Sequence, residues 1–177
     1  MVSDMDTEAA TSLLGLAKHI QTSVNGILRP PSETVMSPDQ PVLPHSLVRN
    51  TRGYIEKVVF QINRTYTQTC YDACAVMLRR LLEILIIEAF EHHGLSSKIK
   101  NQAGDYLYLE DLINLLLAET KWSLGRNTKE GLRKLKRIGD QSAHSRRYNA
   151  RREYIDAAII DLRTVCEELL YLAGLRT

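Results

Sequence analysis

The sequence has little proline, and all of it lies in one short stretch. The five prolines, Pro30, Pro31, Pro38, Pro41 and Pro44, are followed by residues 45–177, which contain none. Because proline fixes φ and removes a backbone donor, residues 29–45 are predicted to form an extended connector. The proline-free remainder leaves helices uninterrupted, and this predicts a compact helical domain over residues 46–177.

Long hydrophobic runs are also missing. Runs such as residues 84–87 are far shorter than the roughly 20 apolar residues of a membrane-spanning helix. Residues 1–10 are acidic and lack the apolar core of a secretory signal. The chain has three cysteines, an odd number, which favours reduced thiols over a disulfide framework. We therefore expect a cytoplasmic protein with no membrane partner.

Motifs of known cofactor chemistry are absent as well. The sequence contains no GxxxxGK[ST] phosphate loop, no GxGxxG, no HExxH and no zinc-ribbon spacing. His92 and His93 are neighbours that point about 100° apart on a helix, so a solvated pair near a helix end is favoured over a metal site. Cys70 and Cys74 are expected to pack and not to bind metal. No cofactor is expected.

What the chain does have is helical periodicity. Hydrophobic residues make up 44% and charged residues 25%, the balance of a soluble globular protein. Apolar spacing predicts an N-terminal helical arm over residues 1–28 and, after the linker, five helices: 49–63, 67–93, 109–120, one that opens with Asn127 as its cap, and 151–172. Gly94 is a plausible stop for the second. The fold class is therefore all-α, a small helical bundle.

The helix predicted over residues 67–93 is apolar on nearly every side. A helix of that kind is buried all round, so we expect it at the centre of the bundle. Its second face should meet either the remaining helices or another subunit, and it is the expected contact of a homodimer. Arg79 and Glu83, one turn apart on it, are expected to pair with each other.

Charge is distributed unevenly along the chain. Residues 129–152 hold nine basic and two acidic residues, a net +7, although the whole chain carries only +2. The rest of the chain is therefore acidic. A basic segment of this density is typical of a surface that meets nucleic acid. Its candidate nucleic-acid-binding residues are Arg133, Lys134, Lys136, Arg146, Arg147 and Arg151.

Three further residues of this segment form a candidate catalytic group. If the helix that opens at Asn127 continues far enough, Arg137, then Asp140 or Gln141, and His144 share one of its faces. A solvent-exposed face that carries a cation, a polar group and an imidazole is suited to bind and act on a phosphodiester. The alternative from the same residues is that Gly139 ends the helix, Asp140 and His144 cap neighbouring ends, and the arginines are solvated.

Two segments resemble one family. Residues 71–83 (YDACAVMLRRLLE) resemble the long helix of HEPN-like proteins (higher eukaryotes and prokaryotes nucleotide-binding), in a branch of unknown function associated with restriction and abortive-infection systems. That branch has a later Gly-Asn/Asp-x-x-Ala-His sequence, matched here by residues 139–144 (GDQSAH). A closing helix would correspond to residues 154–172, and the resemblance covers residues 46–175.

The resemblance implies a homodimeric all-α bundle in a prokaryotic defence or toxin-type system that acts on RNA. Catalytic members of the family are metal-independent endoribonucleases with an arginine, a polar residue, three others and a histidine. Asp140 and His144 match that pattern, with His144 as the expected general base and Asp140 as the residue expected to orient it. The position of the arginine is occupied by Gly139, and a looser spacing assigns its role to Arg137. Lys136, Arg146 or Arg147 are the alternative phosphate ligands.

Two other interpretations remain open. In the first, the chain is a non-catalytic HEPN-like module that binds nucleic acid or a partner protein through its basic segment. In the second, the last two helices form a helix-turn-helix DNA reader, although residues 139–149 make a long turn for that motif. The N-terminal arm and linker suggest docking onto a partner protein or onto the other protomer.

Overall fold

The computed structural model describes residues 42–176. The predicted arm, and all but the last residues of the predicted linker, lie outside these residues. The described part is helical, with one isolated bridge between Lys100 and Tyr106 and no strand. Its elements are α2 (His45–Val48), α3 (Gly53–Thr67), α4 (Tyr71–His92), the 3-10 helix η1 (Ser96–Ile99), α5 (Leu109–Ala118), α6 (Arg126–His144), α7 (Arg152–Asp156) and α8 (Ile159–Leu172). The predicted all-α bundle is confirmed.

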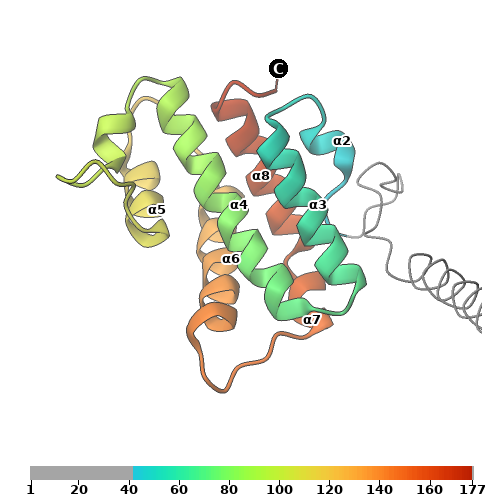
Figure 1. The fold of residues 1–177 in the computed structure, drawn as a ribbon. Coiled ribbons are helices and arrows are strands. Elements are labelled where there is room, and N and C mark those ends of the chain that lie inside the picture. The colour runs from blue at the N-terminus through green and yellow to red at the C-terminus, as the bar shows by residue number, and fades with distance from the viewer. Residues whose placement is uncertain (1–41, 177) are drawn as a thin grey trace, which may run out of the picture. The chain divides into compact units, whose positions relative to one another are not determined.

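Helix α4 lies at the centre of the bundle. It contacts α3, α5, α6, α7, α8 and η1, and in Figure 1 it crosses the middle of the view. The apolar side chains on the several faces of α4 are therefore covered mostly by the other helices of the same chain. Val76, 36% exposed, is the one large hydrophobic side chain of α4 that is exposed within the described structure. No helix among the described residues is long and apolar enough to cross a membrane.

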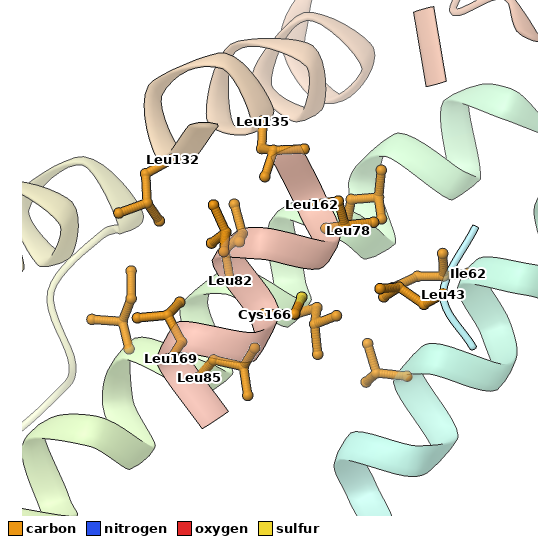
Figure 2. Close-up of a cluster of buried hydrophobic side chains, with 14 of the residues drawn as sticks. Leu43, Ile62, Leu78, Leu82, Leu85, Leu132, Leu135, Leu162, Cys166 and Leu169 are labelled. Carbon is orange, nitrogen blue, oxygen red and sulfur yellow. The ribbon is translucent and has the colours of Figure 1, made fainter. Parts of the chain in front are cut away.

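The core forms where α4, α6 and α8 meet, and α3 closes its far side. Figure 2 shows the side chains that α4, α6 and α8 direct into this space, all of them buried: Leu78, Leu82, Leu85, Leu132, Leu135, Leu162, Cys166 and Leu169. Burying side chains of this size stabilises a fold by roughly 1.5–3 kcal/mol each. The basic helix α6 thus packs on the core through one apolar face, while its opposite face is exposed to solvent.

The segment before α2 belongs to this core. Val42 and Leu43 are fully buried. The side chain of Asn63 on α3 receives a hydrogen bond from the Leu43 N–H at 3.0 Å and donates one to the Leu43 carbonyl at 2.7 Å. This buried amide satisfies both backbone groups of Leu43. The packed domain therefore includes residues 42–45, which proline content assigned to the linker.

The helix ends follow local backbone chemistry. Gly94, with φ of 69°, ends α4 as predicted, and the Leu95 N–H returns to the Phe90 carbonyl at 2.8 Å. The same turn ends α3, but there the left-handed residue is Thr69, with φ of 58°. The Cys70 N–H reaches the Thr65 carbonyl at 2.9 Å. Both are the Schellman pattern that glycine usually completes.

Several predicted helix boundaries are wrong. The helix predicted over residues 49–63 is Gly53–Thr67, the one predicted over residues 67–93 is Tyr71–His92, and the one predicted over residues 109–120 is Leu109–Ala118. Helix α6 begins at Arg126 with Gly125 at its cap, and not at a cap formed by Asn127. The Gly125 carbonyl accepts the Lys129 N–H at 3.1 Å, and the Glu168 carboxylate accepts the Gly125 N–H at 2.7 Å. The helix predicted over residues 151–172 is two helices, α7 and α8. At the break, the carbonyl of Ala157 accepts a hydrogen bond from Lys134 Nζ at 2.8 Å.

Candidate nucleic-acid interface

Helix α6 runs without a break through Gly139 to His144. The interpretation in which Gly139 ends the helix is therefore wrong. Gly139 is buried where α6 crosses α4, and a Cβ at that position would lie 2.6 Å from Arg79 Cβ and 3.1 Å from the Ala75 carbonyl oxygen. The residue is glycine because the two helices approach each other too closely for a side chain.

The continuous helix brings Arg137, Gln141 and His144 onto one exposed face. They stand at positions i, i+4 and i+7, which nearly complete two turns, and all three are exposed. Arg137 and His144 are separated by about 10 Å along the helix axis, from seven residues of 1.5 Å rise. His144 is the last helical residue, and its imidazole has no hydrogen bond to any other described residue. The face is accessible to a large ligand.

Asp140 lies beside this face but is engaged elsewhere. Its Oδ1 accepts a hydrogen bond from Arg79 Nε at 2.7 Å, and its Oδ2 accepts one from Lys136 Nζ. Burial by itself would raise the pKa of Asp140, but the two cationic donors outweigh burial and hold the pKa below its ordinary value. Asp140 is therefore ionised near neutral pH and ties α6 to α4.

Arg79 is the residue of this site that the sequence did not reveal. The predicted pair with Glu83 is present, with Arg79 Nη1 at 3.7 Å, but Asp140 lies closer, at 2.7 Å from Arg79 Nε. Spacing along the chain signals the contact with Glu83, one helical turn away. No local pattern signals Asp140, 61 residues farther on. The guanidinium of Arg79 therefore lies next to the position where the resembled family carries its motif arginine.

The structure divides the basic residues into free and paired groups. Arg133, Arg137, Arg146, Arg147 and Arg151 are exposed and make no ion pair with another described residue. Lys134 is paired with Asp161 at 2.6 Å. Lys136 is paired with both Glu110 and Asp140, which raise its pKa through their hydrogen bonds. The free cations lie on α6 and on the segment that follows it, residues 145–151.

Two hollows flank the exposed face. The first hollow, of about 270 Å³, is lined by residues of α5 and α6, among them Glu110, Arg133, Lys136 and Asp140. The second, of about 330 Å³, is lined by Lys134, Ile138, Tyr148, Tyr154 and Ala157, and we name it the tyrosine hollow. Arg137 and Gln141 line both. These two side chains therefore form the wall that the two hollows share.

The other candidate ligands of the sequence are not gathered into a site. His93 Nε2 is 3.1 Å from the Leu172 carbonyl oxygen, and its ring packs against Trp122. Cys70 is exposed, whereas Cys74 and Cys166 are buried. Burial raises the pKa of Cys74 to about 12 and also raises that of Cys166. The described residues contain no group of three or more histidine, cysteine or acidic side chains placed to hold a metal ion.

Comparison of the chain with protein-family models, with curated proteins and with solved structures finds no match. The fold and the site define a small all-helical bundle with one basic helix face between two hollows. The HEPN-like resemblance rests on residues 71–83 and 139–144, and these segments are in contact through Arg79 and Asp140.

Proposed function

We propose that this chain is a HEPN-like, RNA-directed protein of a prokaryotic defence or toxin-type system, and that it acts as a homodimeric, metal-independent endoribonuclease. One observation carries the proposal. Helix α6 is continuous and presents the guanidinium of Arg137 and the imidazole of His144 together on one exposed face. Arg133, Arg146 and Arg147 add free positive charge around them, which suits the phosphate backbone of RNA.

His144 would act as the general base. It would remove the proton of a ribose 2′-OH, and the resulting oxygen would attack the adjacent phosphorus. The bond from phosphorus to the 5′-oxygen would break, that oxygen would leave as a hydroxyl after taking a proton from water, and a 2′,3′-cyclic phosphate would remain. Assistance by a positioned base contributes on the order of 10²–10⁴ in rate. Arg137 would stabilise the charge that develops on the phosphate.

Asp140 was expected to orient His144, but its contacts support a different role. Both of its oxygens are taken by Arg79 and Lys136. We propose instead that Asp140 fixes the position of α6 against α4, so that Arg137 and His144 are presented on a rigid element. Arg79, exposed by about a quarter of its side chain, would add to the positive potential beside the missing motif arginine.

A homodimer would complete this site. In one chain the backbones of Arg137 and His144 are about 10 Å apart along the axis, so only their side-chain tips could converge on one phosphate. A two-fold arrangement that pairs the α6 faces would bring a second copy of each residue to the same place. Sedimentation as a monomer at micromolar concentration would count strongly against a paired site.

A second candidate function is a non-catalytic module that binds RNA or a partner protein. The observation that favours it is the closure of α6 on α4 at Gly139, which leaves no room for an arginine side chain at the motif position. In this case the free arginines bind phosphates and His144 performs no chemistry.

The experiment that separates the two candidates is an RNA cleavage assay in EDTA with the full chain. It compares the wild type with His144→Ala and Arg137→Ala. Matched controls are His92→Ala and Arg64→Ala, which remove exposed side chains of the same type from α4 and α3. Cleavage that leaves cyclic phosphate ends, and is lost only in the first two variants, supports the ribonuclease. Salt-sensitive binding without cleavage supports the module, and absence of both contradicts the proposal.

A further inference from the structure

The tyrosine hollow holds two aromatic rings that the proposed chemistry does not use. Tyr148, on the segment after α6, and Tyr154, on α7, stack with ring centroids 6.0 Å apart and an angle of 21° between their planes. Tyr154 remains 43% exposed. A tyrosine pair that served only to fill the core would be covered, whereas this pair lines an open hollow.

The segment that carries Tyr148 is held in place from both sides. The Ala150 N–H donates to the Asp72 carboxylate of α4 at 2.9 Å, and Ala150 is itself largely buried. At the other end, the Ser145 N–H returns to the Gln141 carbonyl at 3.0 Å. The ring of Tyr148 is therefore positioned before any ligand arrives, which reduces the ordering cost of binding.

The two hollows differ in the carboxylates that line them. The first hollow has the free cation Arg133 but is also lined by the carboxylates of Glu110 and Asp140, which already neutralise Lys136. The tyrosine hollow has no acidic lining residue. Lys134 there is paired with Asp161, so Arg137 is the lining cation that remains free for a ligand.

The remaining lining residues suit a nucleobase. The amide of Gln141 offers both a donor and an acceptor, which match the polar edge of a base. A volume of about 330 Å³ is at the low end of the roughly 300–1,000 Å³ typical of small-ligand sites, and it suits one nucleotide. Aromatic rings beside a free guanidinium are the usual means of holding single-stranded nucleic acid.

We propose that the tyrosine hollow is a subsite for one unpaired nucleotide of an RNA strand. The base stacks on the ring of Tyr154, Gln141 contacts the edge of the base, and Arg137 binds the adjoining phosphate. Because Arg137 also lines the first hollow, the strand continues from this subsite along the α6 face toward Arg133. The inference rests on the proposed RNA-directed function and adds to it the requirement for a single strand.

The test measures binding of a 12-residue oligouridylate to the full chain in EDTA, together with the same oligonucleotide made abasic. Tyr154→Leu removes the aromatic face at similar size, and Tyr154→Phe keeps it. Stacking of one base predicts that Tyr154→Leu weakens oligouridylate binding on the order of 5- to 100-fold. Tyr154→Phe should bind like the wild type, and the abasic strand should bind equally to all three proteins.

Controls separate this inference from the proposed function. Tyr171→Leu removes an exposed tyrosine of α8 outside the hollow and should not change binding. If the wild type binds no RNA, both proposals fail. If it binds RNA but Tyr154→Leu binds both strands like the wild type, or weakens both equally, only the nucleotide subsite is overturned. Displacement of oligouridylate by free UMP at equal concentration would overturn the assignment to an RNA strand.

Discussion

The Nε atom of Arg79 donates a hydrogen bond of 2.7 Å to Oδ1 of Asp140, and this ion pair joins α4 to α6 beside Gly139. The contact links two segments that are far apart in sequence. It places a guanidinium where α6 itself has no side chain. The basic face of α6 is therefore positioned by a polar contact next to the helix crossing as well as by the apolar core below it.

The crossing predicts that Gly139→Ala destabilises the fold. The added Cβ would meet Arg79 Cβ and a backbone oxygen of α4, neither of which can rotate away. Overpacking of this kind costs about 1–3 kcal/mol, and the better helix propensity of alanine offsets at most about 1 kcal/mol. Urea denaturation should show a net loss of about 1–2 kcal/mol. Gly53→Ala, where no atom lies within 4 Å, is the control and should lose nothing.

The contacts of Asp140 predict a pH-dependent contribution to stability. Its pKa in the folded chain lies below the ordinary value of 3.8, because hydrogen bonds from Lys136 and Arg79 outweigh burial. The contribution is therefore complete above the unfolded pKa and is lost as pH falls through the lower folded pKa. Asp140→Asn should cost about 1–2 kcal/mol at pH 7 and progressively less in acid.

The control for Asp140 is Asp111→Asn, which changes an exposed carboxylate on α5 that has no ion pair to another described residue. It should alter stability by less than about 0.5 kcal/mol at either pH. Denaturation curves recorded at pH 7 and at pH 3 compare the two variants. A cost of Asp140→Asn that is the same at both values would show that the carboxylate does not act through its charge.

The turn after α3 predicts a stabilising substitution. Thr69 adopts φ of 58°, where a β-branched residue is strained and glycine is not. Thr69→Gly should raise the free energy of unfolding by about 0.5–1 kcal/mol, since relief of strain exceeds the greater freedom of glycine in the unfolded chain. Thr69→Ala keeps the strained φ and should bring little gain. Thermal melts of equal midpoint for the two variants would contradict this account.

The division of basic residues predicts which of them govern the salt dependence of RNA binding. Removal of a free cation such as Arg133 or Arg146 should reduce the steepness of the plot of log affinity against log salt by up to about 1 per phosphate contact. Lys136→Met should leave the slope nearly unchanged, because its ammonium is held by Glu110 and Asp140, and should instead lower stability. Filter-binding titrations at several salt concentrations give the slopes. An equal change of slope in the variants of Arg133, Arg146 and Lys136 would contradict the separation into free and paired cations.

Helical periodicity was sufficient to predict the fold class and the central place of α4. Boundaries that depend on distant partners were not predictable. The break between α7 and α8 is accompanied by a hydrogen bond from Lys134 to the Ala157 carbonyl, and the start of α6 by one from Gly125 to Glu168. Neither of these contacts leaves a signal in the local sequence.

The candidate site was predictable to the extent that it lies on one helix. Arg137 and His144 share a face because of their spacing, once α6 is known to continue through Gly139. The contact of Arg79 with Asp140 and the pairing of Tyr148 with Tyr154 were not predicted, because each joins two different elements. Sequence gives the periodicity of each helix but not the register at which two helices cross.

The distribution of the three thiols has a practical consequence. Cys74 and Cys166 are buried and resist ionisation, whereas Cys70 is exposed at the start of α4. A maleimide dye should therefore attach at one place in the unaltered chain. That place is two residues from Asp72, whose carboxylate holds the segment that carries Tyr148. The chain thus supplies its own attachment point for a fluorescent reporter next to the tyrosine hollow, without removal of any cysteine.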